Sequence, residues 1–287
     1  MEAAIQFDPA TFKAAMREQW DQSAPGWNDH TAALRTWLGR ATGAMLDMAG
    51  IGPGDRVLDV AAGAGDQTLD IARRVGPEGR VLATDISPAI LALAQDNARR
   101  AGLAQVEVQV SDGEALDLEA ASFDAAVSRL GLMFFPDPLQ GLRQMHRALR
   151  PGGGVAVLVF GEPAANPCVS RLLATALRHA GLPPRDPHQP GSLFSLGRPG
   201  RLDELFSEAG FSQVASTRLA APFEMPSAAH YLRFIRSSAS PIQQILSRLD
   251  VPAQQAAWDD MERQLHAFDT AQGWSGPNEL VLTAGRA

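Results

Sequence analysis

The sequence predicts an α/β fold, with a mostly parallel sheet covered by helices on both faces. First, apolar strand-like runs alternate with helix-like stretches through residues 55–160, and this alternation implies parallel strands. Second, residues 56–85 (RVLDVAAGAGDQTLDIARRVGPEGRVLATD) form a strand, a small-residue turn, a helix and a strand that ends in an acid. Glycines let backbone N–H groups approach a ligand closely, and such an acid can accept hydrogen bonds from a ribose diol. The unit therefore predicts a bound nucleoside.

The elements follow in order along the chain. Residues 1–50 read as helices, with a break at Pro25-Gly26 and a second helix over Trp37–Met48 that ends at Gly50. Strands and helices then alternate through Val57–Ala61, Asp66–Val75, Arg80–Thr84, Ala89–Ala101, Val106–Val110, Asp124–Ser128, Leu139–Leu149 and Val155–Phe160.

After Phe160 the chain becomes rich in proline and glycine, and the regular alternation ends. The pattern predicts a helix near Val169–Ala180, a helix over Leu202–Ala209, and strands over Ser212–Leu219 and Glu279–Ala284. We expect residues 1–50 to form an N-terminal helical lid and residues 51–287 to form one domain. Its segments 161–198 and 226–272 would add a helical cover at one edge.

Composition excludes several classes of protein. The chain has 287 residues, a net charge of -7 and a single lysine, Lys13, with no basic run, so it lacks the electrostatic signature of nucleic-acid or membrane-surface binding. The single cysteine, Cys168, excludes an internal disulfide framework. No metal-binding motif is present, so no metal is expected. The N-terminus lacks signal-peptide features and no apolar stretch approaches ~20 residues, which predicts a cytoplasmic protein.

The glycine-rich turn departs from the dinucleotide fingerprint. That fingerprint needs G-x-G-x-x-G, whereas the third position here is Thr68 after Gly63 and Gly65. A short-chain reductase would also need a Tyr–Lys pair, and the only candidates are Tyr231 and Lys13. The G-x-S-x-G motif of hydrolases is absent as well.

The same turn resembles the glycine-rich loop of class I S-adenosylmethionine (SAM)-dependent methyltransferases, in which a strand and an acid precede small-x-Gly-x-Gly. Asp59, Ala61, Gly63 and Gly65 match this pattern, with Ala61 in place of the commoner first glycine. The resemblance continues in register through Asp85, Ser111-Asp112-Gly113, SFDAAVSRLGLMFFPDP (122–138), ALRPGGGVAVLVF (148–160) and the terminal LVLTAGRA. It is greatest to the ubiquinone/menaquinone-biosynthesis-like branch. It implies a Rossmann-like seven-stranded sheet of order 3-2-1-4-5-7-6, with the last strand antiparallel.

The resemblance also implies which residues hold SAM and its product S-adenosylhomocysteine. These are Asp59, Ala61, Gly63, Gly65, Asp85, Ile86, Asp112 and Gly113. Asp85 has an alternative role as a helix N-cap, but Ser87, followed by Pro88, fits that role better. Asp112 has an alternative role as a turn residue. Arg129, just after the fourth strand, either lines the pocket or pairs with a carboxylate.

The acceptor side is less determined by the sequence. Trp27, Met133, Phe134 and Tyr231 are candidate substrate contacts, although such side chains are equally plausible in the core. His30 is the best general-base candidate among the six histidines. An apolar, aromatic wall suits a small hydrophobic or aromatic acceptor, with C-, O- and N-methylation (EC 2.1.1.-) and a monomer or homodimer all open.

Three other functions remain as alternatives. The first is a SAM-fold protein that binds a nucleoside or a partner without catalysis. The second is a nicotinamide-dependent reductase, which the missing third glycine disfavours. The third is a nucleic-acid methyltransferase; the acidic pI and Ser128-Arg129-Leu130-Gly131 in place of Asn-Pro-Pro-Tyr disfavour it.

Overall fold

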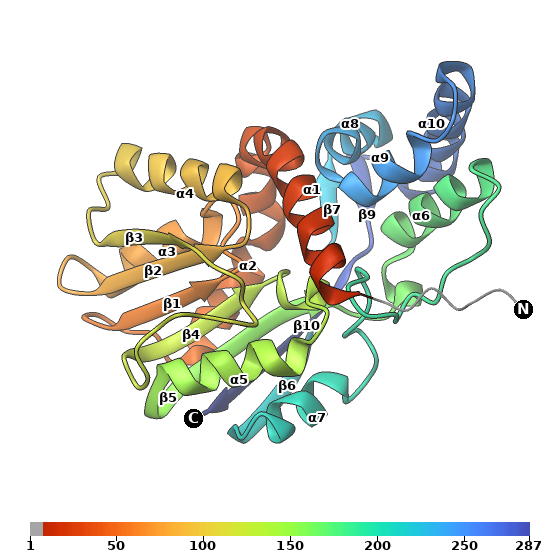
Figure 1. Cartoon of the computed structure of the whole chain (residues 1–287). Coiled ribbons are helices and arrows are strands. Elements are labelled where there is room, and N and C mark those ends of the chain that lie inside the picture. Colours follow the sequence, from red (N-terminus) through yellow and green to blue (C-terminus); the bar gives the residue numbers. More distant parts are fainter. Residues whose placement is uncertain (1–7) are drawn as a thin grey trace, which may run out of the picture.

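A seven-stranded sheet forms the centre of the fold (Figure 1), in a computed structural model that describes residues 8–287. The first seven residues of the expected lid lie outside the described residues. The strand order is β3-β2-β1-β4-β5-β10-β6. β1 to β5 are parallel, and β10 is antiparallel to both β5 and β6. The predicted fold class, strand order and antiparallel last strand are therefore confirmed. The bounds are β1 Arg56–Val60, β2 Arg80–Asp85, β3 Val106–Val110, β4 Phe123–Arg129, β5 Leu149–Phe160, β6 Ser212–Ala220 and β10 Glu279–Arg286.

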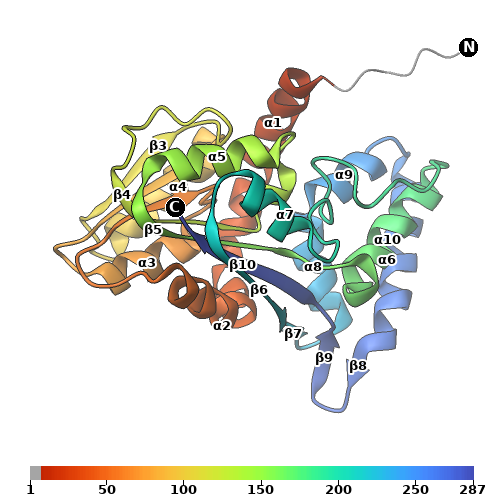
Figure 2. The same cartoon turned by 90° about the horizontal axis from the view of Figure 1, so that it is seen from below.

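Both faces of the sheet are covered by helices. Helices α2 (Thr31–Ala49), α3 (Asp66–Val75) and α4 (Pro88–Arg100) pack on one face (Figures 1 and 2). Helices α5 (Pro138–Ala148) and α7 (Arg201–Glu208) pack on the other. Burial on both sides explains why β5 is one continuous apolar run from Val155 to Phe160 instead of an alternating pattern.

Local signals in the sequence set several helix ends. Gly50 adopts φ +73° and ends α2, as expected for a left-handed C-cap. The Ser87 hydroxyl accepts a hydrogen bond of 3.1 Å from the Ile90 backbone N–H, and Pro88 begins α4. The assignment of the cap to Ser87, which leaves Asp85 for another role, is therefore confirmed.

The predicted break at Pro25-Gly26 is wrong. α1 runs without interruption from Pro9 to Asp29 and passes through Pro25. Pro25 is exposed, so its ring lies toward solvent, and the lost backbone donor is tolerated there. Gly26 faces α8 (Ala228–Ser238), where a Cβ would lie only 2.1 Å from the Ser237 carbonyl oxygen. Close packing against α8 thus stabilises the helix where local propensity disfavours it.

The remaining elements gather beyond one end of the sheet (Figures 1 and 2). α6 (Pro167–His179), α8, α9 (Ser240–Leu246) and α10 (Val251–Leu265) form this helical cover, and α1 lies between α4 on the sheet side and α8 on the cover side. A small sheet of order β7-β9-β8 joins the cover to the domain. It was not predicted, because its strands are only two to four residues long: β7 Phe223–Met225, β8 Asp269–Thr270 and β9 Gly273–Gly276.

Short 3-10 turns connect some of these elements. They are η1 Leu132–Phe134 after β4, η2 Pro163–Ala165 before α6 and η3 His266–Phe268 after α10. η1 matters for function, because it lies directly after the carboxyl end of β4.

Candidate functional site

A cavity of about 150 Å³ lies at the carboxyl ends of β1, β2, β3 and β4. Open α/β sheets bind ligands at this edge. The glycine-rich turn after β1, the end of β2, the turn after β3 and the loop after β4 all contribute to its wall, and α1 closes it from the opposite side. Sequence motifs far apart in the chain therefore meet at one site. The predicted residues in the lining are Ala61, Gly63, Asp85, Ile86, Asp112, Gly113 and Arg129.

The turn after β1 adopts left-handed backbone conformations. Ala61, Gly63 and Gly65 have φ values of +56°, +58° and +85°, and such values strain any residue with a Cβ. Gly65 does not line the cavity. A Cβ at Gly65 would lie 2.9 Å from the Cβ of Ala94 on α4, so this glycine allows α4 to pack closely on the turn.

Asp59 supports the turn from beneath and does not line the cavity. Its carboxylate is fully buried and accepts hydrogen bonds from the Thr68 hydroxyl at 2.6 Å and the Gln67 amide at 3.1 Å. Burial raises the pKa of Asp59 to about 6, although both hydrogen bonds act to lower it. The carboxylate thus anchors the start of α3, and the turn above it is held in place.

Asp85 presents its carboxylate at the end of β2. The Gly63 backbone N–H donates to Oδ2 at 3.0 Å, and the Ser87 N–H donates to Oδ1 at 3.0 Å. Burial raises the pKa of Asp85 to about 6, against the lowering effect of these bonds. A carboxylate has about four acceptor positions, so Asp85 retains capacity to accept from a ligand's hydroxyl groups.

Asp112 reaches the cavity from the turn after β3 and pairs with α1. The Lys13 ammonium lies 2.7 Å from Asp112 and 2.6 Å from Glu114. Burial acts to lower the pKa of Lys13, but hydrogen bonds to the two carboxylates raise it above its ordinary value overall. The sequence analysis missed Lys13 as a site residue. Its only signal was that it is the single lysine of the chain.

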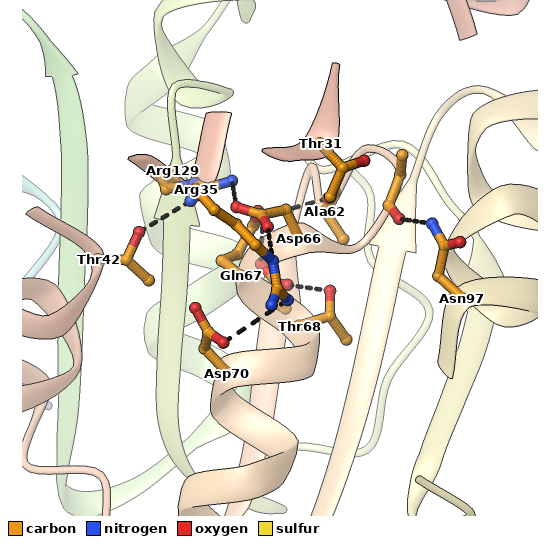
Figure 3. A network of polar contacts seen from close by, with 12 residues as sticks. Thr31, Arg35, Thr42, Ala62, Asp66, Gln67, Thr68, Asp70, Asn97 and Arg129 are labelled. Atoms are coloured by element: carbon orange, nitrogen blue, oxygen red, sulfur yellow. Dashed lines mark hydrogen bonds and ion pairs between the residues drawn. The ribbon is translucent and has the colours of Figure 1, made fainter. Parts of the chain in front are cut away.

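Arg129 has both of the roles that were predicted as alternatives, as a lining residue of the pocket and as the partner of a carboxylate. It lines the cavity, and its guanidinium lies 2.9 Å from Oδ2 of Asp66 and donates to the Thr42 hydroxyl at 2.8 Å. Arg35 donates to the other oxygen of Asp66 at 2.8 Å (Figure 3). Two arginines from α2 and β4 therefore converge on the first residue of α3. Arg35 and Asp66 were not predicted, because their contact joins residues 31 positions apart.

A second cavity, of about 950 Å³, adjoins the first. Both are lined by Phe12, Met16, Trp20, Trp27, Leu130 and Phe134. The second cavity extends under the helical cover, and its walls are mostly aliphatic and aromatic. All four predicted acceptor contacts, Trp27, Met133, Phe134 and Tyr231, line it. The two cavities therefore place a smaller site at the carboxyl edge of the sheet beside a larger apolar chamber.

His30 does not line either cavity. It lies between α1 and α2, where its Nδ1 is 2.8 Å from the Gly26 carbonyl oxygen and its ring packs edge-on against Phe234. None of the six histidines, all within the described part of the chain, lines the cavities. Within residues 8–287 no group of three or more His, Cys, Asp or Glu side chains is arranged to hold a metal ion. In the same range, no helix is long and apolar enough to cross a membrane.

The sheet order and the cavity at its carboxyl edge define the fold of a class I SAM-dependent methyltransferase. Residues 35–173 match the model of the ubiE/COQ5 methyltransferase family, which confirms the predicted resemblance to ubiquinone- and menaquinone-type methyltransferases. This match starts in α2 and ends in α6. It includes every strand end of the first cavity and excludes α1 and most of the cover.

Individual relatives agree with this match. The 2-phytyl-1,4-naphtoquinone methyltransferase of Synechococcus elongatus is 38% identical over 152 residues, 52% of this chain and 65% of the relative. The demethylmenaquinone methyltransferase of Deinococcus radiodurans is 32% identical over 39% of this chain and 51% of the relative. The chain therefore spans between about half and two thirds of the length of these relatives. Among solved structures, the [4+2]-cyclase SpnF aligns with a TM-score of 0.60 and 22% identity over 95% of this chain and 96% of SpnF, and this likeness shows the fold.

Proposed function

We propose that this protein transfers a methyl group from SAM to a hydrophobic, ring-containing small molecule. The observation that carries the proposal is the junction of the two cavities. A site built from the glycine-rich turn and Asp85 shares a largely aromatic wall with a large apolar chamber. The names of the two quinone methyltransferase relatives support an acceptor of quinone type.

The residues present fit SAM. The backbone of the turn at Ala61–Gly63 offers a surface without bulky side chains, and the Asp85 carboxylate suits the ribose hydroxyls. Asp112 and Gly113, which also line the cavity, fit the adenine part. When bound, SAM supplies a methyl group that is already activated by a positively charged sulfur. The protein's main task is then alignment, which can contribute about 7–11 kcal/mol.

We further propose that α1 and the helical cover act as the lid of the site. α1 is attached to the sheet side at three places. Lys13 pairs with Asp112 and Glu114, Asp21 accepts a hydrogen bond of 2.5 Å from Ser87, and the Asn97 amide donates to Asn28 at 2.9 Å. On its other side, α1 contacts α8 and α9. In this position α1 covers one side of both cavities, and exclusion of water by such a lid strengthens polar interactions inside a site.

Calorimetric titration with SAM and S-adenosylhomocysteine tests the cofactor site. We expect Asp85→Asn to weaken binding of both by about tenfold or more, because hydrogen bonds to a charged acceptor contribute about 1.5–3 kcal/mol. Asp96→Asn, which changes a half-buried carboxylate on α4 that lines neither cavity, is the matched control and should bind normally. Failure of the native protein to bind either nucleoside would refute the proposal.

Binding alone does not establish methyl transfer, because one fold can host several reactions, and a structure of this fold is named as a [4+2]-cyclase. A panel of quinones, phenols and enols incubated with SAM, followed by mass spectrometry for a gain of one methyl group, addresses the reaction. Nucleoside binding without methylation of any acceptor would favour the non-transferring alternative.

A further inference from the structure

Two buried polar residues of the second cavity have side chains without protein partners. Gln19 is 6% exposed and Tyr231 is 3% exposed; both line the cavity, and neither side chain hydrogen-bonds to another described residue. The indole N–H of Trp27 also lacks a hydrogen-bond partner, but protein atoms enclose it and it does not face the open cavity. An unsatisfied buried polar group costs about 1–3 kcal/mol, and folded proteins leave few of them.

These groups come from both sides of the chamber. Gln19 and Trp27 belong to α1, and Tyr231 belongs to α8. The Phe234 ring contacts both other rings, with its centroid 5.8 Å from Trp27 and 6.4 Å from Tyr231. Stacking on Trp274 at 4.5 Å and edge contact with Phe223 at 5.1 Å hold the Tyr231 ring. Neighbouring aromatic rings thus fix the position of the Tyr231 side chain.

Within residues 8–287, no buried side chain suited to remove a proton accompanies them. Among described residues, the charged groups that line the second cavity are Arg178, Arg185, Asp186 and Arg248, and all four are exposed. Of the carboxylates in the first cavity, Asp66 pairs with Arg129 and Arg35, and Asp112 and Glu114 pair with Lys13. Asp85 accepts from the Gly63 and Ser87 backbone. The exposed Asp186 carboxylate accepts a hydrogen bond of 2.9 Å from the His188 backbone N–H. In the described part of the chain, an acceptor in this chamber therefore meets buried hydrogen-bond donors and no buried, unpartnered base.

We propose that Gln19 and Tyr231 bind the acceptor by an oxygen atom and hold it as an enolate or phenolate. This inference rests on the proposed function and names its substrate class: a ring compound acidic enough to lose its proton to water before it reacts. Neutral donors preorganised around an oxyanion stabilise it without a competing positive charge. Burial raises the pKa of Tyr231 far above its ordinary value, so its phenol keeps its proton and donates.

The transfer step balances without a base. An electron pair of the acceptor anion forms the new bond to the methyl carbon, and the carbon–sulfur bond breaks with its pair left on sulfur. The negative charge of the acceptor and the positive charge of the sulfonium are both cancelled. No proton moves in this step. If the attack comes from carbon, the hydrogen on that carbon leaves to water afterwards.

The test uses 4-nitro-1-naphthol, whose phenolate is coloured, in the presence of saturating S-adenosylhomocysteine. Absorbance titration against pH gives the pKa of the free and the bound probe, and we expect binding to lower it. Tyr231→Phe and Gln19→Met should each weaken phenolate binding about 10- to 100-fold, the range for a hydrogen bond to a charged group. The methyl ether of the probe, which cannot ionise, should bind both variants within about threefold of the native protein.

Gln22→Met is the matched control, because Gln22 is an exposed residue of α1 that lines neither cavity. Binding of the neutral naphthol in preference to the phenolate, equal loss of phenol and ether in the variants, or no binding of the probe would each overturn the inference. Calorimetry with S-adenosylhomocysteine on the same samples separates the two proposals. If the nucleoside binds and the probe result is negative, only the inference fails; if the nucleoside does not bind, the proposed function fails.

Discussion

The backbone N–H of Gly63 donates a hydrogen bond of 3.0 Å to Oδ2 of Asp85. This bond joins the glycine-rich turn after β1 to the acid at the end of β2, 22 residues later in the chain. Gly63 holds φ +58° there, a conformation in which glycine carries no Cβ strain. The two motifs that identify the nucleoside site are therefore one hydrogen-bonded unit, and a change in one alters the other.

The protonation state of Asp85 should control nucleoside affinity. Because burial raises its pKa to about 6, the carboxylate is ionised at pH 8 and gains a proton as pH falls through 6. If the ribose hydroxyls need the ionised form, affinity for S-adenosylhomocysteine should fall about tenfold per pH unit below that value. Calorimetry from pH 8 to 5 measures this, and Asp85→Asn should show weak binding without the slope. Constant affinity of the native protein across that range would contradict the role of Asp85.

Asp59 should make the stability of the protein depend on pH over the same range, and this is measured by unfolding instead of by ligand binding. Its folded-state pKa of about 6 lies above the ordinary 3.8, so the ionised carboxylate is disfavoured in the folded protein. Its contribution to stability is complete below about pH 3.8 and is lost as pH rises through 6. Asp59→Asn removes this titration, so its free energy of unfolding relative to the native protein should rise between pH 4 and 8. Urea denaturation of both proteins measures the difference, and a difference that falls with pH would contradict the assignment.

Arg129 should contribute to stability far more than a surface arginine. Its side chain and that of Asp66 are only 7% and 8% exposed. Arg129→Met leaves the Asp66 carboxylate buried with Arg35 as its remaining cation, and loss of one partner of a buried pair costs about 3 kcal/mol or more. Arg73→Met breaks an exposed pair with Asp70 in the adjoining α3 and should cost about 0–1 kcal/mol. Equal midpoints for the two variants in urea would show that the buried network contributes little.

Lys13 should determine how tightly α1 closes the first cavity. It is the cation that pairs α1 with Asp112 and Glu114 across the site. Lys13→Met should increase amide hydrogen exchange in the first half of α1 and accelerate dissociation of S-adenosylhomocysteine. Arg17→Met, on the same helix, removes an exposed cation for which no ion pair is present among described residues, and it should change neither rate. If both variants exchange like the native protein, packing and not this ion pair holds α1.

The sequence predicted what local motifs encode. The Gly50 and Ser87 caps and the meeting of the glycine-rich turn with Asp85 follow from short patterns. The strand order and the place of Asp112 at the same site were implied by the family resemblance that these motifs carry. Contacts made by α1 were not predictable in the same way. Lys13 pairs with a residue 99 positions away, and the continuation of α1 through Pro25 depends on packing against α8.

The acceptor side shows the same limit. Trp27 and Tyr231 were recognised as aromatic candidates, but that their polar atoms lack partners depends on how α1 and α8 face each other. Gln19 was not predicted as a site residue. His30 was the general-base candidate, yet its Nδ1 faces the Gly26 carbonyl and it lines neither cavity. In each of these cases the role of the residue depends on the direction of its side chain, and the order of residue types along the sequence does not encode that direction.

Ala61 and Gly131 should depend on each other for stability. A Cβ at Gly131 would lie 2.4 Å from the Cβ of Ala61, although φ of -105° at Gly131 suits any residue. Gly131→Ala alone should therefore destabilise the protein by about 1–3 kcal/mol through overpacking. Ala61→Gly alone should stabilise it by about 1 kcal/mol, since it relieves the strain of φ +56°. In the double variant the clash is gone, so the effect of Gly131→Ala should nearly vanish. Urea denaturation of the four proteins gives the coupling energy, which should reach about 1–3 kcal/mol; additive effects would mean that the two loops separate in solution.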